Sequence, residues 1–452
     1  MRFISVLFIG LFMFAASVQA SESLLDIQEV TSEGGIRAWL VEDHNIPVIA
    51  MQFGFRGAGA VADPEDKQGL ARMLSNTLDE GAGGLDAQAF QKELRDLVIS
   101  LSFSASRDDF TGSLKTLSKN KARAFELTKL ALTDPRFDKE AVARMRRANQ
   151  SRIRSSLSNP DWMAARVLND KAFAGHPYAL NSGGTLSSLE KVSPDDLEKF
   201  HEAYLGKNNL VVAVAGDITA QELGGILDEV FGELPEVELP ETENIEVQNQ
   251  GEIFHYKLDI PQTVIEIIQP GIGRKDPDFH TGQVMNFILG SSGFGSRLTE
   301  EIREKRGLTY GIYSYFYDLA HLKGFAVSTS TKNENVSEML DLIAAEFTKM
   351  TGEPVSDKEL SDAQSYLIGS LPLSLTSTDK IAGLLNSLQL DDLPVDYLDR
   401  REAAIRATTK DDIMALARRI LNPNAFVTVL AGQPEGLDVL NPVTVKTLPN
   451  VE

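Results

Sequence analysis

The chain has 452 residues, and its 65 Asp and Glu outnumber 44 Lys and Arg to give a formal net charge of −21. This surplus of negative charge argues against nucleic acid as a partner and favours neutral or basic ligands. The sequence contains no cysteine, which excludes disulfides and thiolate metal ligands, and a chain of this size can form a core without such cross-links.

The first twenty residues are typical of an export signal. Met1 and Arg2 provide a positive start, Phe3 to Ala16 form an apolar run, and positions 18 and 20 carry the small side chains that a signal peptidase reads. The run is short for a membrane span, and no charged stop-transfer pattern follows it. We predict that residues 1–20 are removed and that the mature chain is periplasmic, with no membrane span. Retention of the segment as a membrane anchor is the alternative.

Five short features recur in the same order in the two halves of the chain, at offsets between 213 and 219 residues. A nearly constant offset over five features indicates an internal duplication. The recurring features are Ile46-Pro47 and Ile260-Pro261, Asp63-Pro64 and Asp276-Pro277, Asp138-Lys139-Glu140 and Asp357-Lys358-Glu359, Asp195-Asp196 and Asp411-Asp412, and the strand-like runs that end at Gly216 and Gly432. We predict two homologous halves, residues 21–235 and 251–452, joined by a linker at 236–250 that is rich in proline and glutamate.

The first half begins with two expected strands and a helix. Alternating, β-branched runs at Ile36 to Val41 and Val48 to Phe55 predict the strands. Asp63 is expected to cap the helix, with Pro64 at its first position and Gly81 at its end. Apolar residues recur along this segment at helical spacing: Leu70, Met73, Leu74 and Leu78.

Further helices and a last strand complete each half. In the first half they are a long helix from Lys139 to Ser156, a helix capped near Ser193 and a buried strand that ends at Gly216. Strands followed by clustered helices predict an α+β fold. Each half is therefore expected to be a largely antiparallel sheet with helices packed on one face.

The segment around the first helix carries a family resemblance. A glycine-rich stretch from Gly57 to Ala62 precedes Asp63-Pro64, and Gly69-Leu70-Ala71-Arg72 follows. This pattern resembles the pitrilysin and mitochondrial processing peptidase family, in which the helix reads G-L-A-H-x-L-E-H. The resemblance covers essentially the whole mature chain, through the following motifs: Arg107-Asp108, Asn159-Pro160, His176-Pro177, Ala215-Gly216-Asp217, and Ser296 through Tyr310.

The resemblance also shows what is missing. In that family two histidines of H-x-x-E-H hold zinc, and the glutamate between them is the general base. The matching positions here are Arg72, Ser75 and Asn76. A guanidinium stays protonated and cannot ligate a metal. The family's further glutamate ligand falls near Ser151 and Arg152, in a stretch from 141 to 160 that has no Asp or Glu.

A different register does not restore the zinc motif. The chain has six histidines, and no two of them are four residues apart on one helix face. They stand at positions 44, 176, 201, 255, 280 and 321. We expect no metal in this chain and no peptidase activity when it is alone.

A second functional element of the family is present. There an arginine and, seven residues later, a tyrosine donate hydrogen bonds to the substrate carbonyl and to the oxyanion that develops on it. Arg303 and Tyr310 have this spacing, so the resemblance implies a catalytic role for both. One such donor contributes on the order of 3 kcal/mol to transition-state stabilisation. Without the resemblance, Arg303 would be a solvated helix residue and Tyr310 a core strand residue.

Family members also bind peptides as an added strand at a sheet edge that follows the zinc helix. Leu101 to Arg107 matches that segment, with Ser104 and Ala105 where the family typically has Asn-Ala. Such binding uses backbone groups and tolerates changes of side chain. The resemblance implies that Ser104 and Ala105 contact substrate, and a plain edge strand is the alternative.

Two functions are compatible with a lost zinc helix and a retained Arg/Tyr pair. Small members of the family form two-chain clamshells, and in some of them one chain keeps the zinc motif while the other keeps the pair. The resemblance then implies that this chain is a non-catalytic subunit of a heterodimeric zinc peptidase. The homologous partner subunit carries H-x-x-E-H and holds the zinc, and the heterodimer degrades peptides. The alternative is a stand-alone peptide-binding or scaffolding protein without a catalytic partner.

Overall fold

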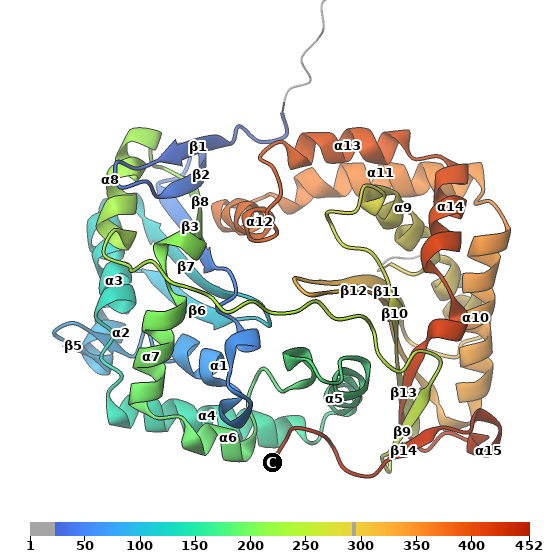
Figure 1. Cartoon of the computed structure of the whole chain (residues 1–452). Coiled ribbons are helices and arrows are strands. Elements are labelled where there is room, and N and C mark those ends of the chain that lie inside the picture. The colour runs from blue at the N-terminus through green and yellow to red at the C-terminus, as the bar shows by residue number, and fades with distance from the viewer. Residues whose placement is uncertain (1–22, 292–294) are drawn as a thin grey trace, which may run out of the picture.

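The computed structural model describes residues 23–291 and 295–452 (Figure 1). The predicted export signal, residues 1–20, lies outside this part of the chain. Each half of the sequence forms one lobe around a six-stranded sheet. Within the described residues, no helix combines the length and apolar character needed to cross a membrane.

The first sheet has the strand order β1-β2-β8-β3-β7-β6, and all its neighbouring pairs are antiparallel except β2 and β8. The two strands predicted near the start are β2 and β3, the latter with the predicted bounds. The strands are β1 Gln28–Thr31, β2 Arg37–Glu42, β3 Val48–Phe55, β6 Ser100–Ala105, β7 Phe110–Leu117 and β8 Leu210–Gly216, with a small separate pair of β4 Gly81–Ala82 and β5 Leu85–Asp86.

The second sheet has the order β11-β12-β10-β13-β9-β14. Five adjacent strands, β9-β13-β10-β12-β11, repeat the arrangement β2-β8-β3-β7-β6 of the first sheet, including the one parallel pair between the first two. The two halves are therefore homologous in topology as well as in sequence. The strands are β9 Ile253–Lys257, β10 Gln262–Pro270, β11 Ile312–Leu319, β12 Leu322–Lys332, β13 Val427–Gly432 and β14 Val443–Val445.

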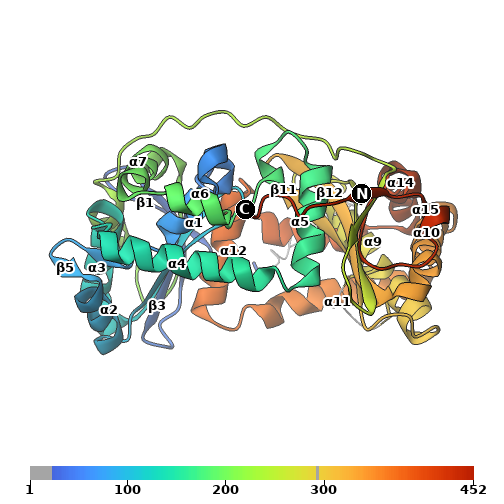
Figure 2. The same ribbon diagram turned by 90° about the horizontal axis from the view of Figure 1, so that it is seen from below.

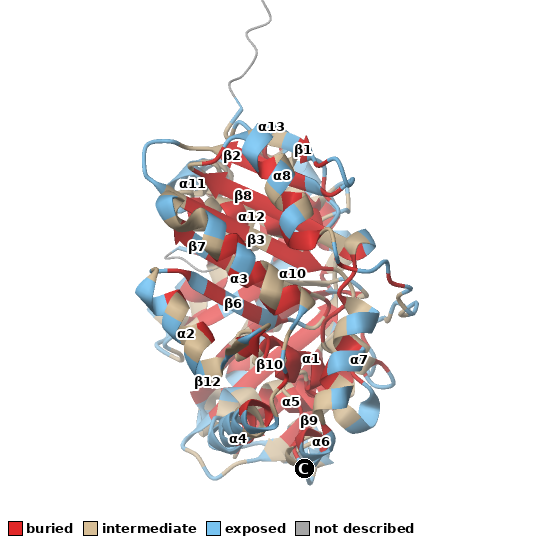
Figure 3. Cartoon of the chain, turned by 90° about the vertical axis from the view of Figure 1, so that its left-hand side faces the viewer, coloured by how far each residue is buried: buried red, intermediate tan, exposed pale blue. Residues whose placement is uncertain are grey.

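Helices of each half pack on one face of its own sheet, as the sequence predicts, and Figure 3 shows the buried strands of the first sheet beneath helices with exposed outer faces. In the first half these are α1 Leu70–Ser75, α2 Ala87–Asp96, α3 Lys121–Thr133, α4 Lys139–Ser156, α6 Leu186–Lys191, α7 Pro194–Tyr204 and α8 Ala220–Phe231. In the second they are α9 Phe279–Leu289, α10 Val336–Gly352, α11 Asp357–Ser374, α13 Tyr397–Ala407, α14 Lys410–Ile420 and the short α15 Leu437–Leu440.

The other face of each sheet is covered by one helix from the opposite half. Helix α5 (Pro160–Ala172) of the first half packs on β10 and β13, and helix α12 (Thr378–Leu390) of the second half packs on β3 and β8 (Figure 1). Leu385 of α12 is fully buried in a cluster with Trp39 and Ala213 of the first sheet. Val167 of α5 is equally buried against Val429 of the second. This reciprocal exchange fixes the lobes to each other.

The predicted linker crosses one side of the molecule from the first lobe to the second (Figure 2). Residues 234–248 form neither helix nor strand. Two hydrogen bonds tether this segment to both lobes, since Val237 N donates to Asn208 Oδ1 in the first and Ile245 N donates to His321 O in the second. The linker therefore lies on the protein instead of looping away from it.

The first helix departs from the prediction at both ends. Pro64 has extended ψ, a short 3₁₀ turn follows it, and α1 begins only at Leu70 and ends at Ser75. The cause is Gly69, which has a φ of 86° and turns the chain just before the helix. Gly69, not Asp63, is the N-cap residue, and the carboxylate of Asp63 accepts hydrogen bonds from Gly69 N at 2.7 Å and from Ala71 N at 2.8 Å. The predictions that Asp63 is the N-cap, that Pro64 is the first helical residue and that the helix runs to Gly81 are therefore wrong.

A cavity of about 1150 Å³ between the lobes gathers carboxylates from both of them. Asp109 comes from the first half, and Asp318 and Asp391 from the second. Burial, together with repulsion from Asp108, raises the pKa of Asp109 to about 7. The charged form of Asp109 is therefore unfavourable in the folded protein.

Replacing Asp109 with Asn is expected to flatten the dependence of stability on pH. The carboxyl of Asp109 has a pKa of roughly 3.9 when unfolded, below its folded value of about 7. Its stabilising contribution is thus fully present below pH ~3.9 and is lost as the pH rises towards 7. Urea unfolding at several pH values should show that Asp109→Asn is more stable than wild type above pH 7. Asp392→Asn is the control, since Lys275 lowers the pKa of that exposed carboxyl. An equal gain in both variants would contradict the prediction.

Candidate functional site

The segment that matches the zinc helix lies at a small pocket of the first half, with a volume of about 170 Å³. Arg72 comes from α1, Arg152 from α4 and Trp162 from the first turn of α5. We call this site the arginine pocket. It is lined by Arg72, Asn149, Arg152, Ile153, Ser156, Trp162, Asn181, Ser182 and Gly183.

The charged side chains that line the arginine pocket, Arg72 and Arg152, are both positive. No Asp or Glu is among its lining residues, so the structure offers the two guanidinium groups no counter-charge there. Burial lowers the pKa of Arg72, and repulsion from Arg152 lowers it further. Within the described part of the chain, the buried Arg72 Nε has no hydrogen-bond acceptor. Such a site repels cations and attracts anions.

The other two positions of the lost motif do not line this pocket. Ser75 is buried, and its hydroxyl donates to the Arg72 carbonyl oxygen at 2.9 Å, inside its own helix. Asn76 is the C-terminal cap of α1 and is half-buried. Among the described residues, no three His, Cys, Asp or Glu side chains are grouped so that they could hold a metal ion. The residues present therefore do not fit zinc.

The Arg/Tyr pair lies in the second half, just before the edge strand β11. Arg303 belongs to a π-helical turn, Thr299–Glu304, and its Nε lies 3.4 Å from a carboxylate oxygen of Glu304. Tyr310 is 90% exposed. The alternative that Tyr310 is a core strand residue is therefore wrong. A phenol held in the open is available to a molecule that approaches from outside.

The predicted peptide-binding segment is an edge strand. Strand β6 ends the first sheet and has β7 as its neighbour, and Ser104 and Ala105 are its last two residues. The Ser104 side chain is exposed, whereas that of Ala105 is buried. Helix α1 packs against β6, so this edge adjoins the helix that carries Arg72. The position of β6 is compatible with both alternatives, an edge that binds a peptide strand and an edge strand without a ligand.

Some residues of the arginine pocket could not be predicted from the sequence. The family pattern places Arg152 near the lost ligand position, and the structure brings Arg152 and Arg72 to one pocket. Trp162, Asn149 and the loop 181–183 carry no motif that indicates this location. The Asn159-Pro160 motif belongs to the family resemblance as a helix end, and it does not predict that Trp162 shares a pocket with residues of α4.

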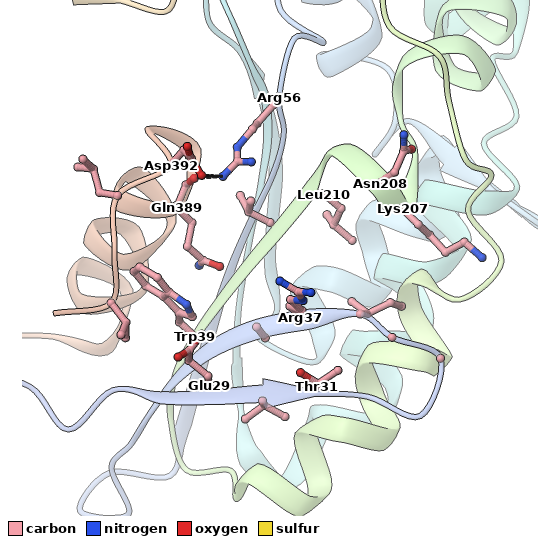
Figure 4. A pocket seen from close by; sticks show the side chains of 18 of the residues that line it. Glu29, Thr31, Arg37, Trp39, Arg56, Lys207, Asn208, Leu210, Gln389 and Asp392 are labelled. Atoms are coloured by element: carbon pink, nitrogen blue, oxygen red, sulfur yellow. Dashed lines mark hydrogen bonds and ion pairs between the residues drawn. The ribbon is translucent and has the colours of Figure 1, made fainter. Parts of the chain in front are cut away.

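A larger pocket of about 650 Å³ lies elsewhere, where the end of α12 meets the first sheet (Figure 4). Arg56, which points toward Asp392 at 4.0 Å and donates to the Gln389 carbonyl, lines it together with Trp39 and Arg37. It shares no lining residue with the arginine pocket. We assign it to the junction between the lobes.

Two family models match most of the chain. Residues 55–185 match the model described as insulinase (peptidase family M16), and residues 191–367 match the model described as peptidase M16 inactive domain. A Helicobacter pylori protein named non-peptidase homolog YmxG is 30% identical over 378 residues, which cover 82% of this chain and 84% of that protein. The mitochondrial-processing peptidase subunit beta of Saccharomyces cerevisiae is 22% identical over 72% of this chain and 74% of its own length.

Solved structures show the same architecture. The crystal structure of a peptidase M16 inactive domain from Pseudomonas fluorescens superposes with a TM-score of 0.84 at 30% identity and covers 91% of this chain and 98% of that one. A protease from Helicobacter pylori superposes with a TM-score of 0.82 at 19% identity and covers 90% of this chain and all of its own. The second likeness supports the fold alone.

Proposed function

This chain belongs to the insulinase (peptidase M16) family, and we propose that it is the zinc-less subunit of a heterodimeric metallopeptidase that degrades peptides in the periplasm. The chain itself is a zinc-less pseudo-peptidase, because it matches the inactive-domain model and has Arg72, Ser75 and Asn76 at the metal-site positions. The partnership, the peptide substrate and the compartment are the proposal.

In this proposal the partner carries the H-x-x-E-H motif and the zinc, which activates the attacking water. Arg303 and Tyr310 of this chain donate hydrogen bonds to the carbonyl oxygen of the peptide as it gains negative charge. The lobes of this chain form half of the chamber wall. Each chain is then incomplete without the other, because the nucleophile and the oxyanion donors lie on different subunits.

The exposure of Tyr310 is the observation that carries this proposal. Tyr310 is 90% exposed, so packing of its ring in the core does not account for it. Arg303 pairs with Glu304, and both side chains are more than a third exposed. The phenol of Tyr310 is accessible to an incoming carbonyl.

The isolated chain is expected to bind no zinc and to cleave no peptide, whereas its mixture with an H-x-x-E-H homologue encoded by the same genome should cleave. The reason is that the arginine pocket repels cations and the chain supplies no base at position 75. Elemental analysis after dialysis against zinc, and a fluorogenic peptide assay with and without a chelator, measure both outcomes. One zinc per chain, or cleavage by the chain alone, would contradict the proposal.

A stand-alone peptide-binding protein is the second candidate. The exposed edges of both sheets, at β6 and β11, favour it, because each can accept an added strand. It differs from the first candidate in its assembly and in its indifference to Arg303 and Tyr310. A neighbouring reading frame of similar length with H-x-x-E-H and without the Arg/Tyr pair favours the heterodimer, and gel filtration after co-expression distinguishes the two directly.

A further inference from the structure

We propose that the arginine pocket binds a carboxylate, and that this carboxylate is the free C-terminus of a peptide. The pocket stands where a relative would hold its metal, and here it has become a site for an anion. The proposal rests on the proposed function only in taking the ligand to be a peptide. It requires neither a partner chain nor catalysis.

The first argument is the uncompensated charge. Arg72 and Arg152 come from different helices and share one pocket whose lining has no acidic residue. Arg72 is half-buried and Arg152 is exposed at the rim. Two guanidinium groups that repel each other are stabilised by an anion between them. A carboxylate also matches the planar fork of a guanidinium, which can donate two parallel hydrogen bonds to it.

The second argument is the state of Arg72 itself. Among the described residues its buried Nε finds no acceptor, although buried donors in folded proteins are as a rule satisfied. Three other arginines also have an unpaired Nε, but each of them donates to a backbone carbonyl through another nitrogen: Arg56, Arg146 and Arg166. The protein therefore holds a cation in a partly buried place without supplying the groups that would balance it. A ligand with negatively charged oxygens would supply them.

The walls of the pocket are fixed and polar. Asn181 accepts a hydrogen bond from Gly183 N at 3.1 Å and donates to Asn450 O at 3.2 Å, which holds the loop 181–183 in place. Asn149 donates to the sulfur of Met73 at 3.1 Å. Trp162 lies in the first turn of α5, an end at which a helix carries partial positive charge. The pocket is thus preformed, and its volume of about 170 Å³ suits a small anionic group.

The position of the arginine pocket in the fold favours the C-terminus of a peptide as its ligand. Helix α1, which carries Arg72, packs against the edge strand β6, and an edge strand is where an extended peptide can add to a sheet. A peptide that lies along this edge can end at the arginine pocket. A free carboxylate at that end would then be held by Arg72 and Arg152.

Tryptophan fluorescence can test the proposal on the full-length chain. The sequence has two tryptophans, Trp39 and Trp162, so Trp39→Phe leaves Trp162 as the reporter in the pocket. This variant is titrated with a neutral octapeptide that has a free C-terminus, with its C-terminal amide, with an amide that contains an internal Glu, and with inorganic phosphate. Isothermal titration calorimetry measures the same four ligands on the wild type.

The free-carboxylate peptide is expected to bind at least about tenfold more tightly than its amide, as the loss of charge-assisted hydrogen bonds implies. Arg152→Gln and Arg72→Gln should each remove this preference. Arg147→Gln is the matched control, because Arg147 is an exposed arginine of the same helix α4 and does not line the pocket. Arg152 is exposed, so its replacement keeps the test valid if Arg72→Gln does not fold.

Three results would overturn the proposal. They are equal affinity for the acid and the amide, an unchanged preference in Arg152→Gln, and equal or tighter binding of phosphate or of the internal Glu. These measurements use the isolated chain and no cleavage assay. Failure here therefore leaves the heterodimer proposal untouched, and an inactive mixture leaves the carboxylate site untouched.

Discussion

Replacing Tyr310 with Phe is expected to lower turnover by the mixed peptidase by roughly ten- to a thousandfold, at or below the usual loss of one oxyanion donor. The phenol oxygen is the only atom removed, and an exposed side chain contributes little to the fold. The loss should fall on kcat, since the hydrogen bond to the oxyanion strengthens only in the transition state. Steady-state kinetics of the mixture with a fluorogenic peptide measure this effect.

Tyr313→Phe is the control for Tyr310→Phe. Tyr313 is also an exposed tyrosine, 48% accessible, at the start of the neighbouring strand β11. It loses the same hydroxyl without belonging to the Arg/Tyr pair. Full activity of the Tyr310→Phe mixture, or an equal loss in both variants, would show that Tyr310 has no catalytic role.

The second large effect is on stability, and it is expected for a substitution in α12, one of the two exchanged helices. Leu385→Ala in α12 is expected to lower the free energy of unfolding by about 2–5 kcal/mol, as for other buried leucines. Leu385 is fully buried between α12 and the first sheet, so the variant leaves a cavity at the contact between the lobes. Because α12 belongs to the second half in sequence and to the first sheet in packing, the two lobes should still unfold in one transition.

Guanidinium unfolding followed by circular dichroism and by tryptophan fluorescence measures both features of this prediction. Leu373→Ala is the matched control, since Leu373 of the preceding helix α11 is 77% exposed and its truncation should change stability by less than about 0.5 kcal/mol. Two separate transitions, of which the substitution shifts only one, would show that the lobes fold independently.

Local signals explain which parts of the fold could be predicted. The helix from Lys139 to Ser156 has the predicted bounds, and Ser193 caps α7 with its side chain, because periodicity and capping chemistry act over a few residues. The observed start of α1 differs from the prediction because Gly69 adopts positive φ, which the Asp-Pro pair does not indicate. The exchange of α5 and α12 depends on contacts between segments that are about 100 to about 330 residues apart, for which no local pattern exists.

For the candidate site too, some features could be predicted from the sequence and others could not. The replacement of the metal ligands at Arg72 and Asn76 follows from residue types at motif positions, without coordinates. The meeting of Arg72 with Arg152 and Trp162 depends on how α1, α4 and α5 pack. Sequence reasoning therefore identified what the site had lost, and only the structure indicated what the site could bind.

The paired arginines also bear on the history of this chain. A histidine regained at position 72 would still face Arg152, a fixed cation that repels a divalent metal. A glutamate gained at position 152 alone would pair with Arg72 and neutralise it. Neither single substitution makes a zinc centre, because Ser75 and Asn76 also replace the base and the second histidine. A metal centre at this place therefore requires several changes together, with both arginines of the pocket replaced.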